Sequence, residues 1–192
     1  MILKRNPETL RAVRWKELIR TKLLSRHLQR FKHSERTLDL GCGWGFSLAI
    51  NPQFWLVDAD KNCVDYLRSK STRVFLADLA QLLPFEDSFF ENVFTHDVLE
   101  HLERDEIVHM FHETRRITQT GGTFMNVVPN MRGYLYGLRP DIGHKTFIDA
   151  ALIRGIAEQT GFELDRVYRS PLKTGLSELF KHNKLVTICR AV

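Results

Sequence analysis

The chain has 192 residues, of which 43% are hydrophobic and 27% are charged, and its net charge is +5. These values suit one globular domain with an ample core and exclude a long disordered or low-complexity protein. No apolar run approaches the roughly 20 residues that a membrane-spanning helix needs, and the N-terminus lacks the apolar core of a secretory signal. We expect the three cysteines, which show no Cys-x-x-Cys spacing, to be reduced thiols of a cytoplasmic protein rather than zinc ligands.

The positive charge is concentrated in residues 1–36, which hold eleven Lys/Arg against three Glu, a net charge of +8. We predict a basic helical extension here, in front of a domain at 37–192. Its apolar positions do not share one helical face, so two helices or one bent helix are expected. Three roles stay open: a solvated face packed beside the domain, a lid over an active site, or a surface for an anionic partner such as nucleic acid or lipid.

A glycine-rich turn, Leu-Asp-Leu-Gly-Cys-Gly-Trp-Gly-Phe, occupies residues 38–46. An apolar run enters it and a helical pattern leaves it, which predicts a buried strand, a tight turn and a helix start that can receive a polar or anionic ligand group. The spacing differs from that of a dinucleotide-binding turn, because Phe46 stands where the third glycine belongs. Asp39 in front would repel a pyrophosphate, but it can hold a cation or accept hydrogen bonds from an amino group. A purely structural acid is the alternative.

Two later apolar runs also end in an acid. Residues 54–57 precede Asp58, and residues 73–77 precede Asp78. An acid about 15–20 residues after the glycines, at the end of the second strand, can bind both hydroxyls of a ribose. A helix cap is an equally simple role for Asp58, and it is the one that we expect for Asp60. Ligands of open parallel sheets bind at the carboxyl edge, so these acids and the turn predict one site there.

The rest of the chain alternates between helical and extended patterns. We predict helices at 46–50, 64–69, about 96–119 and 146–160, and strands at 38–40, 54–57, 73–77, 92–95, 123–128, 162–169 and 185–191. Gly121-Gly122 is expected to break the chain before the fifth strand. The fold class that follows is α/β: a Rossmann-like, doubly wound sandwich with a seven-stranded, mostly parallel sheet. Its last strand runs antiparallel and is inserted beside the fifth.

The Asp-x-Gly-x-Gly-x-Gly turn, the strand-end acids and the Leu-Pro-Phe-containing loop at 82–89 together resemble class I S-adenosylmethionine-dependent methyltransferases of the type 11 group. The resemblance covers residues 37–130 almost without gaps. It implies that the turn cradles the methionine part of the cofactor, Asp58 binds the ribose, Asp78 binds the adenine amino group, and the Leu79 N–H reads the adenine ring. The cofactor-binding residues that it implies are Asp39, Gly41, Cys42, Gly43, Gly45, Asp58, Ala59, Asp78, Leu79 and His96.

Asp-Val-Leu-Glu-His at 97–101 follows the fourth strand. The spacing places Asp97 and Glu100 on one face of the predicted helix, with His101 adjacent. The run resembles the Glu-x-x-Glu-His of ubiquinone-pathway O-methyltransferases and small-RNA 2′-O-methyltransferases, where these side chains hold a divalent metal against the acceptor hydroxyl. The resemblance makes Asp97, Glu100, His101 and His144 a candidate metal site. We favour the alternative without metal, in which His101 or His144 is a pocket residue and general base.

We therefore expect methyl transfer from S-adenosylmethionine, with S-adenosylhomocysteine as product, to an oxygen, carbon or amine of a small or modest-sized acceptor. The Asn/Asp-Pro-Pro-Tyr/Phe motif of enzymes that methylate planar nitrogens is absent. The glycine-rich, aromatic segment 131–145 is the expected acceptor-binding loop. Two alternatives stay open: an RNA 2′-O-methyltransferase that uses the basic segment as a phosphate track, and a non-catalytic cofactor-binding subunit that activates a partner.

Overall fold

The computed structural model describes residues 26–129, 143–170 and 184–192. Most of the predicted basic extension and of the predicted acceptor-binding loop lies outside these residues. Within the described ranges, no helix is long and apolar enough to cross a membrane.

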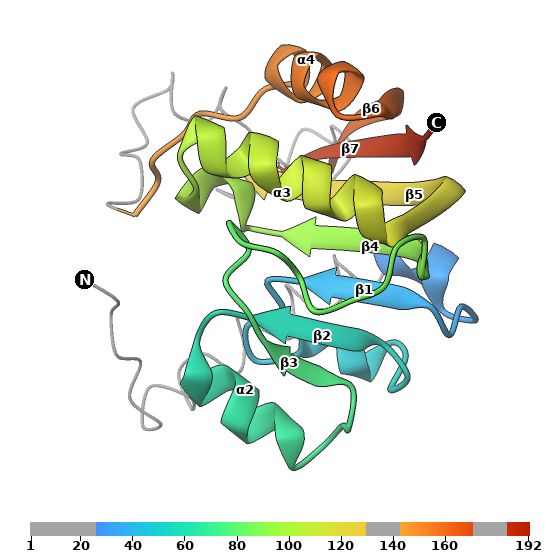
Figure 1. The fold of residues 1–192 in the computed structure, drawn as a ribbon, viewed down its shortest axis with the longest axis vertical. Coiled ribbons are helices and arrows are strands. Elements are labelled where there is room, and N and C mark those ends of the chain that lie inside the picture. Colours follow the sequence, from blue (N-terminus) through green and yellow to red (C-terminus); the bar gives the residue numbers. More distant parts are fainter. Residues whose placement is uncertain (1–25, 130–142, 171–183) are drawn as a thin grey trace.

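Seven strands form one sheet in the order β3-β2-β1-β4-β5-β7-β6 (Figure 1). The strands are β1 Thr37–Leu40, β2 Trp55–Asp58, β3 Val74–Leu76, β4 Phe90–His96, β5 Thr118–Pro129, β6 Phe162–Ser170 and β7 Lys184–Ala191. Strands β1 to β5 pair in parallel, whereas β7 lies antiparallel between β5 and β6. In Figure 1 the arrows of β1, β2 and β4 point one way and that of β7 points the other. The predicted fold class is confirmed, including the antiparallel strand beside the fifth.

Side chains that alternate along the strands build one core on each face of the sheet. Helices α3 (Arg104–Ile117) and α4 (Ala150–Gln159) cover one face, where Leu38, Val93 and Phe124 are fully buried. Helix α2 (Lys61–Arg68) covers the other face together with residues 26–31, over Leu56, Phe94 and Met125. Both faces are therefore closed by helices, which leaves the strand ends as the place for a ligand.

The last part of the predicted basic extension packs on the sheet. Residues 26–28 are helical and lead into the 3₁₀ turn η2 (Gln29–Phe31). Leu28 and Phe31 are only 1% and 3% exposed, and the Phe31 ring stacks on Phe94 with 6.2 Å between the ring centroids. Residues 28–31 thus contribute to the core. The domain boundary at residue 36 and the role of the basic charge stay predictions.

The predicted helix from about 96 to 119 is wrong in its first part. Strand β4 runs to His96, and Asp97 then takes a φ of +54°, in the left-handed region that cannot continue a helix. A 3₁₀ turn, η4 (Leu99–His101), follows. Helix α3 has a start of its own at Arg104, because the Glu103 and Glu106 side chains form a capping box there. The prediction that Asp97 and Glu100 share one helix face is therefore wrong.

The other predicted helices are present with different bounds. The helix at 46–50 is a 3₁₀ turn, η3 (Phe46–Ala49). Helix α2 begins at Lys61 because Asp60 caps it, accepting a hydrogen bond from the Asn62 N–H at 2.9 Å, which confirms the cap. Helix α4 begins at Ala150 rather than 146, because Asp149 caps it in the same way.

Strand β5 runs through Gly121-Gly122, where the sequence predicted a break. The pairing of β4 with β5 shifts register between Phe90 and Asn92, opposite these glycines. Gly121 takes a φ of +77°, so the glycines make an irregularity within the strand rather than its end.

Candidate active site

The three glycines of the turn after β1 all take positive φ, but they have different surroundings. A Cβ on Gly41 would lie 2.4 Å from Val98 Cγ2, and one on Gly45 would lie 2.4 Å from Leu67 Cδ2. A Cβ on Gly43 would meet nothing within 4 Å. Gly41 and Gly45 therefore fit the turn onto its neighbours, whereas Gly43 leaves open space that a ligand can occupy.

The end of β2 meets this turn directly. Asp58 Oδ2 accepts a hydrogen bond from the Gly43 N–H at 2.6 Å, and Asp58 Oδ1 accepts one from the Asp60 N–H at 2.8 Å. Two backbone donors therefore orient the half-buried carboxylate beside the open space at Gly43. Ala59, the next residue, is exposed at the same edge.

Asp39 lies beneath the turn and is only 5% exposed. Its Oδ2 accepts a hydrogen bond from Ser47 Oγ at 2.5 Å. Burial raises the pKa of Asp39 to about 7, against the opposing effect of the Ser47 hydrogen bond and with a contribution from the Asp58 charge. Burial also raises the pKa of the Cys42 thiol, which is therefore protonated. Sequence reasoning missed Ser47, because a serine in a short helix carries no distinctive pattern.

The end of β3 lies beside the glycine turn and the end of β2. Asp78 is exposed, and its Oδ1 accepts a hydrogen bond from the Ala80 N–H at 3.0 Å, which closes a turn. The Leu79 side chain is buried, and its Cδ1 would lie 3.5 Å from a Cβ on Gly41. The structure thus brings the segment after β3 against the glycine turn, as expected.

A single arginine ties the loop after β3 to α3. The Arg116 guanidinium donates hydrogen bonds to the carbonyl oxygens of Leu83 and Phe85 and to the carboxylates of Asp87 and Glu113, at 2.8–3.2 Å. The Glu113 carboxylate also accepts from the Leu83 N–H at 3.0 Å. This support for the segment that begins at Asp78 was not found from sequence, because it spans about 30 positions of the chain.

Directly after β4, Asp97 forms an ion pair with a residue that is far away in the sequence. Lys184, at the start of β7, forms an ion pair and hydrogen bond with Asp97 Oδ1, and both side chains are largely buried. His96 Nδ1 lies 3.7 Å from the other carboxylate oxygen of Asp97. Lys184 was also missed, because 87 positions separate it from Asp97. The Asp97 carboxylate therefore faces a cation of this chain.

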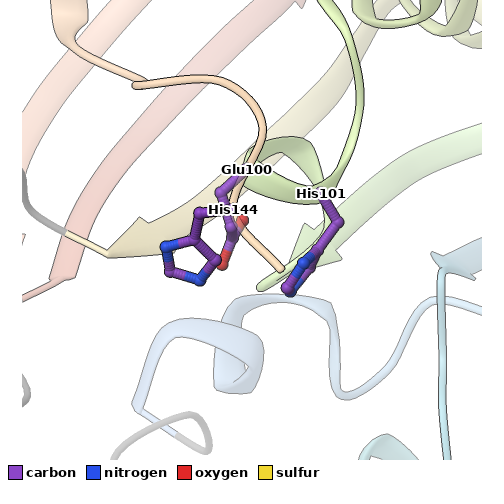
Figure 2. Close-up of side chains that lie close together, drawn as sticks. All are labelled: Glu100, His101 and His144. Atoms are coloured by element: carbon purple, nitrogen blue, oxygen red, sulfur yellow. The ribbon is translucent and has the colours of Figure 1, made fainter. Parts of the chain in front are cut away.

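Glu100, His101 and His144 come together nearby (Figure 2). Each offers one ligand atom within 4.8 Å of the others. Glu100 is 3% exposed, and neither of its carboxylate oxygens has a hydrogen-bond partner among the described residues. Burial and then the neighbouring Asp97 charge raise the pKa of Glu100 to about 8, although Lys184 opposes the shift. Three of the four residues of the predicted metal set thus meet, and Asp97 is not among them.

The segment that carries His144 is attached to the segment that carries Glu100. The Glu100 carbonyl oxygen accepts a hydrogen bond from the Lys145 N–H at 2.8 Å, and the Leu102 carbonyl oxygen accepts one from Thr146 Oγ1 at 2.7 Å. The His101 and His144 rings meet edge to face, with 5.0 Å between their centroids. Backbone contacts between residues more than 40 positions apart therefore fix this cluster.

Comparisons with known proteins agree with this geometry. Residues 38–126 match the family model described as a methyltransferase domain, and that span contains every predicted cofactor-binding residue. No curated protein matches the chain. A solved protein from Pyrococcus horikoshii has a TM-score of 0.69 and 20% identity over 91% of both chains. A SAM-dependent methyltransferase from Archaeoglobus fulgidus has a TM-score of 0.66 and 16% identity over 88% of this chain and 94% of its own.

The putative methyltransferase of Haloferax volcanii, solved in complex with the Trm112 methyltransferase activator, has a TM-score of 0.63 and 18% identity over 90% of this chain and 92% of its own. At such identities the solved structures establish the fold. The family match covers the glycine turn and the ends of β2, β3 and β4, where the fold places its ligand edge. Residues 38–126 thus match a methyltransferase domain, and the chain has the fold of solved SAM-dependent methyltransferases.

Proposed function

We propose that this methyltransferase acts on an oxygen, carbon or amine of a small or modest-sized acceptor, and that a hydroxyl oxygen is the favoured site. The observation that carries the proposal is the cluster of Glu100, His101 and His144 at the carboxyl edge of the sheet. Val98, two residues before Glu100, packs against Gly41. The cluster is thus joined to the glycine turn through one short segment, η4 and the residues before it.

The described residues fit the cofactor in their donor and acceptor chemistry. A carboxylate has about four lone-pair sites, and the backbone donors of Gly43 and Asp60 use two of those on Asp58. The two that remain suit the two ribose hydroxyls. We place the adenine beside Asp78 and Leu79, and the methionine part in the open space at Gly43.

The cofactor supplies an electrophilic methyl group and its own leaving group, so the protein chiefly positions the donor and acceptor. The acceptor oxygen forms a bond to the methyl carbon as the carbon–sulfur bond breaks, and the bonding electrons stay on sulfur. The hydroxyl proton needs an acceptor in the site. His101 Nδ1 lies 3.0 Å from the Gly143 carbonyl oxygen. Since that oxygen can only accept, Nδ1 carries a proton, and in the neutral ring Nε2 has the lone pair that can receive another.

Transfer of labelled methyl from S-adenosylmethionine to matched panels of hydroxyl, amine and carbon acceptors tests this proposal. We expect label chiefly in the hydroxyl panel. Glu100→Gln and His101→Ala should lower kcat while binding of S-adenosylhomocysteine stays close to that of wild type. His112→Ala is the matched control, because His112 is exposed on α3. Label that enters only amines or carbons, or a full kcat in Glu100→Gln, would contradict the favoured acceptor and the assigned site.

A second candidate function draws on the Haloferax neighbour, which is a methyltransferase held by an activator. By analogy, this chain would work as one subunit of a pair. Turnover that appears only after a partner co-purified from the source cells is added would favour this arrangement. The RNA 2′-O-methyltransferase alternative depends on the basic segment, and residues 1–25 of that segment lie outside the described residues.

A further inference from the structure

We propose that Glu100, His101 and His144 bind a divalent transition-metal ion, such as Mn²⁺, Co²⁺ or Zn²⁺, through one carboxylate and two imidazoles. The binding itself is independent of the acceptor, whereas its role in catalysis rests on the proposed function. Three independent features carry the inference: a buried carboxylate without a donor, an imidazole with a fixed tautomer, and a fourth acid that is held by a lysine.

Glu100 is the first of these features. A buried carboxyl group is costly in either protonation state unless its oxygens are hydrogen-bonded, paired or bound to a metal, yet neither oxygen of Glu100 has a hydrogen-bond partner in the described parts of the chain. Figure 2 shows the three side chains close together, with Glu100 and His101 coming from η4 and His144 from the segment after residue 142. A cation at this point would satisfy the oxygens of Glu100.

The state of His101 is the second feature. Its Nδ1–H donates to the Gly143 carbonyl oxygen, and a backbone carbonyl on one ring nitrogen is the usual support of a metal-binding histidine. In the neutral ring the remaining nitrogen, Nε2, carries the lone pair that a metal ligand needs. Bound metals hold nitrogen donors at about 2.0–2.1 Å. Ligand atoms already within 4.8 Å of one another therefore need only small side-chain rotations to share one ion.

Asp97 decides which metal fits. Its carboxylate is paired with Lys184 and lies beside His96. The metal ligands therefore include one carboxylate fewer than the sequence predicted. Magnesium prefers sites made of oxygen donors, whereas imidazole suits zinc, iron, nickel and copper. Two imidazoles and one carboxylate therefore favour a transition-metal ion over Mg²⁺. Three protein ligands leave a position open, as in catalytic metal sites, where an ion can favour the deprotonated form of a bound hydroxyl. With the ion bound, the His101 Nε2 lone pair is a ligand, and the ion replaces His101 as the group that promotes loss of the hydroxyl proton.

Direct binding tests the proposal without any turnover. The full-length protein is stripped with a chelator and titrated with Mn²⁺ or Co²⁺ by calorimetry, and Co²⁺ is also followed by its visible absorption. We expect one ion per chain and much weaker binding of Mg²⁺. Glu100→Gln and His144→Ala should each weaken Co²⁺ binding by about 10-fold or more, while His112→Ala matches wild type. No binding to wild type, or equal binding to Glu100→Gln, would overturn the proposal.

Asp97→Asn tests whether Asp97 is a fourth ligand of the ion. Asparagine is the replacement of choice because it tolerates the positive φ at this position. Three ligands predict Co²⁺ affinity close to that of wild type, and a loss as large as that of Glu100→Gln would overturn the assignment. S-adenosylhomocysteine binding and a thermal melt of each variant show that it is folded. If Co²⁺ binds as predicted while no hydroxyl acceptor is methylated, the metal site stands and the proposed function fails. If a hydroxyl acceptor is methylated but no ion binds, the proposed function stands and the metal site fails.

Discussion

The two sides of the site are built in different ways. The glycine-turn side joins the segment at 39–47 to the ends of the next two strands, through contacts such as that between Asp58 and Gly43, 15 positions apart. The side that we propose for the acceptor joins the segment at 97–101 to the segment at 143–146 and to β7, through contacts between residues 42 and 87 positions apart. The residues of the glycine-turn side therefore lie close together in the sequence, and their spacing predicts that they meet. The second side depends on where distant segments are placed by the fold.

Substitution of the glycines should give the largest effect. Gly41→Ala combines a positive φ with a Cβ 2.4 Å from Val98. The backbone strain costs about 1–2 kcal/mol, and overpacking adds about 1–3 kcal/mol, so we expect unfolding in urea to show a loss of about 2–5 kcal/mol.

Gly43→Ala is the matched variant, because it shares the positive φ but has open space for its Cβ. It should lose only about 1–2 kcal/mol of stability, yet bind S-adenosylhomocysteine more weakly than wild type. Gly121→Ala, also at positive φ with open space, should lose a similar amount of stability and keep full affinity. Equal stability losses in Gly41→Ala and Gly43→Ala would show that the glycines do not have separate roles.

Asp39 should make stability depend on pH when no ligand is bound. Its pKa is 3.8 in the unfolded chain and about 7 in the folded one, so the native state binds the additional proton between these values. The free energy of unfolding should therefore fall as pH rises from about 4 to 7, by on the order of 2–4 kcal/mol, and then level off. Asp39→Asn lacks this titration. Urea unfolding of both proteins at pH 5 and pH 8 gives the difference, and parallel behaviour of the two would contradict the burial of a titrating Asp39.

Asp58→Ala should weaken binding of S-adenosylhomocysteine by about 1–3 kcal/mol, because charge-assisted hydrogen bonds to the ribose are lost. The Gly43 N–H also loses its acceptor. Asp60→Ala is the control: it removes the cap of α2 at a cost of about 1 kcal/mol in stability and should leave affinity unchanged. Calorimetry on both variants measures their affinity for S-adenosylhomocysteine. An unchanged affinity in Asp58→Ala would show that the ribose does not bind at Asp58.

Removal of residues 1–20 should have the smallest effect on the cofactor side. The cut falls before Leu28 and Phe31, which are buried on the sheet, so both of these core residues are retained. We expect affinity for S-adenosylhomocysteine within about twofold of wild type, a change of under about 0.5 kcal/mol, together with loss of acceptor turnover or of binding to an anionic surface. Unchanged turnover would reduce the basic segment to a solvated helix.

How much could be predicted from sequence follows the same division. The sheet, its antiparallel insertion and the approach of Asp58 to the glycine turn were all expected, because strand periodicity and strand-end acids are local features. The helix through Asp97 was not excluded by any local pattern. Its absence depends on a positive φ and on the ion pair with Lys184, which no spacing rule contains. Ser47 and Arg116 were missed for a related reason, since serines and arginines in helices are common and only the fold shows what they contact.

The choice of ligand at the glycine turn gives the most direct test of whether this turn binds S-adenosylmethionine. Wild-type protein is titrated by calorimetry with S-adenosylmethionine, S-adenosylhomocysteine and NAD, and the titrations are repeated with Gly43→Ala. We expect that both methionine-derived ligands bind to one site per chain, that NAD does not bind, and that Gly43→Ala weakens the binding of the methionine-derived ligands. Tight binding of NAD with no binding of either methionine-derived ligand would contradict this expectation.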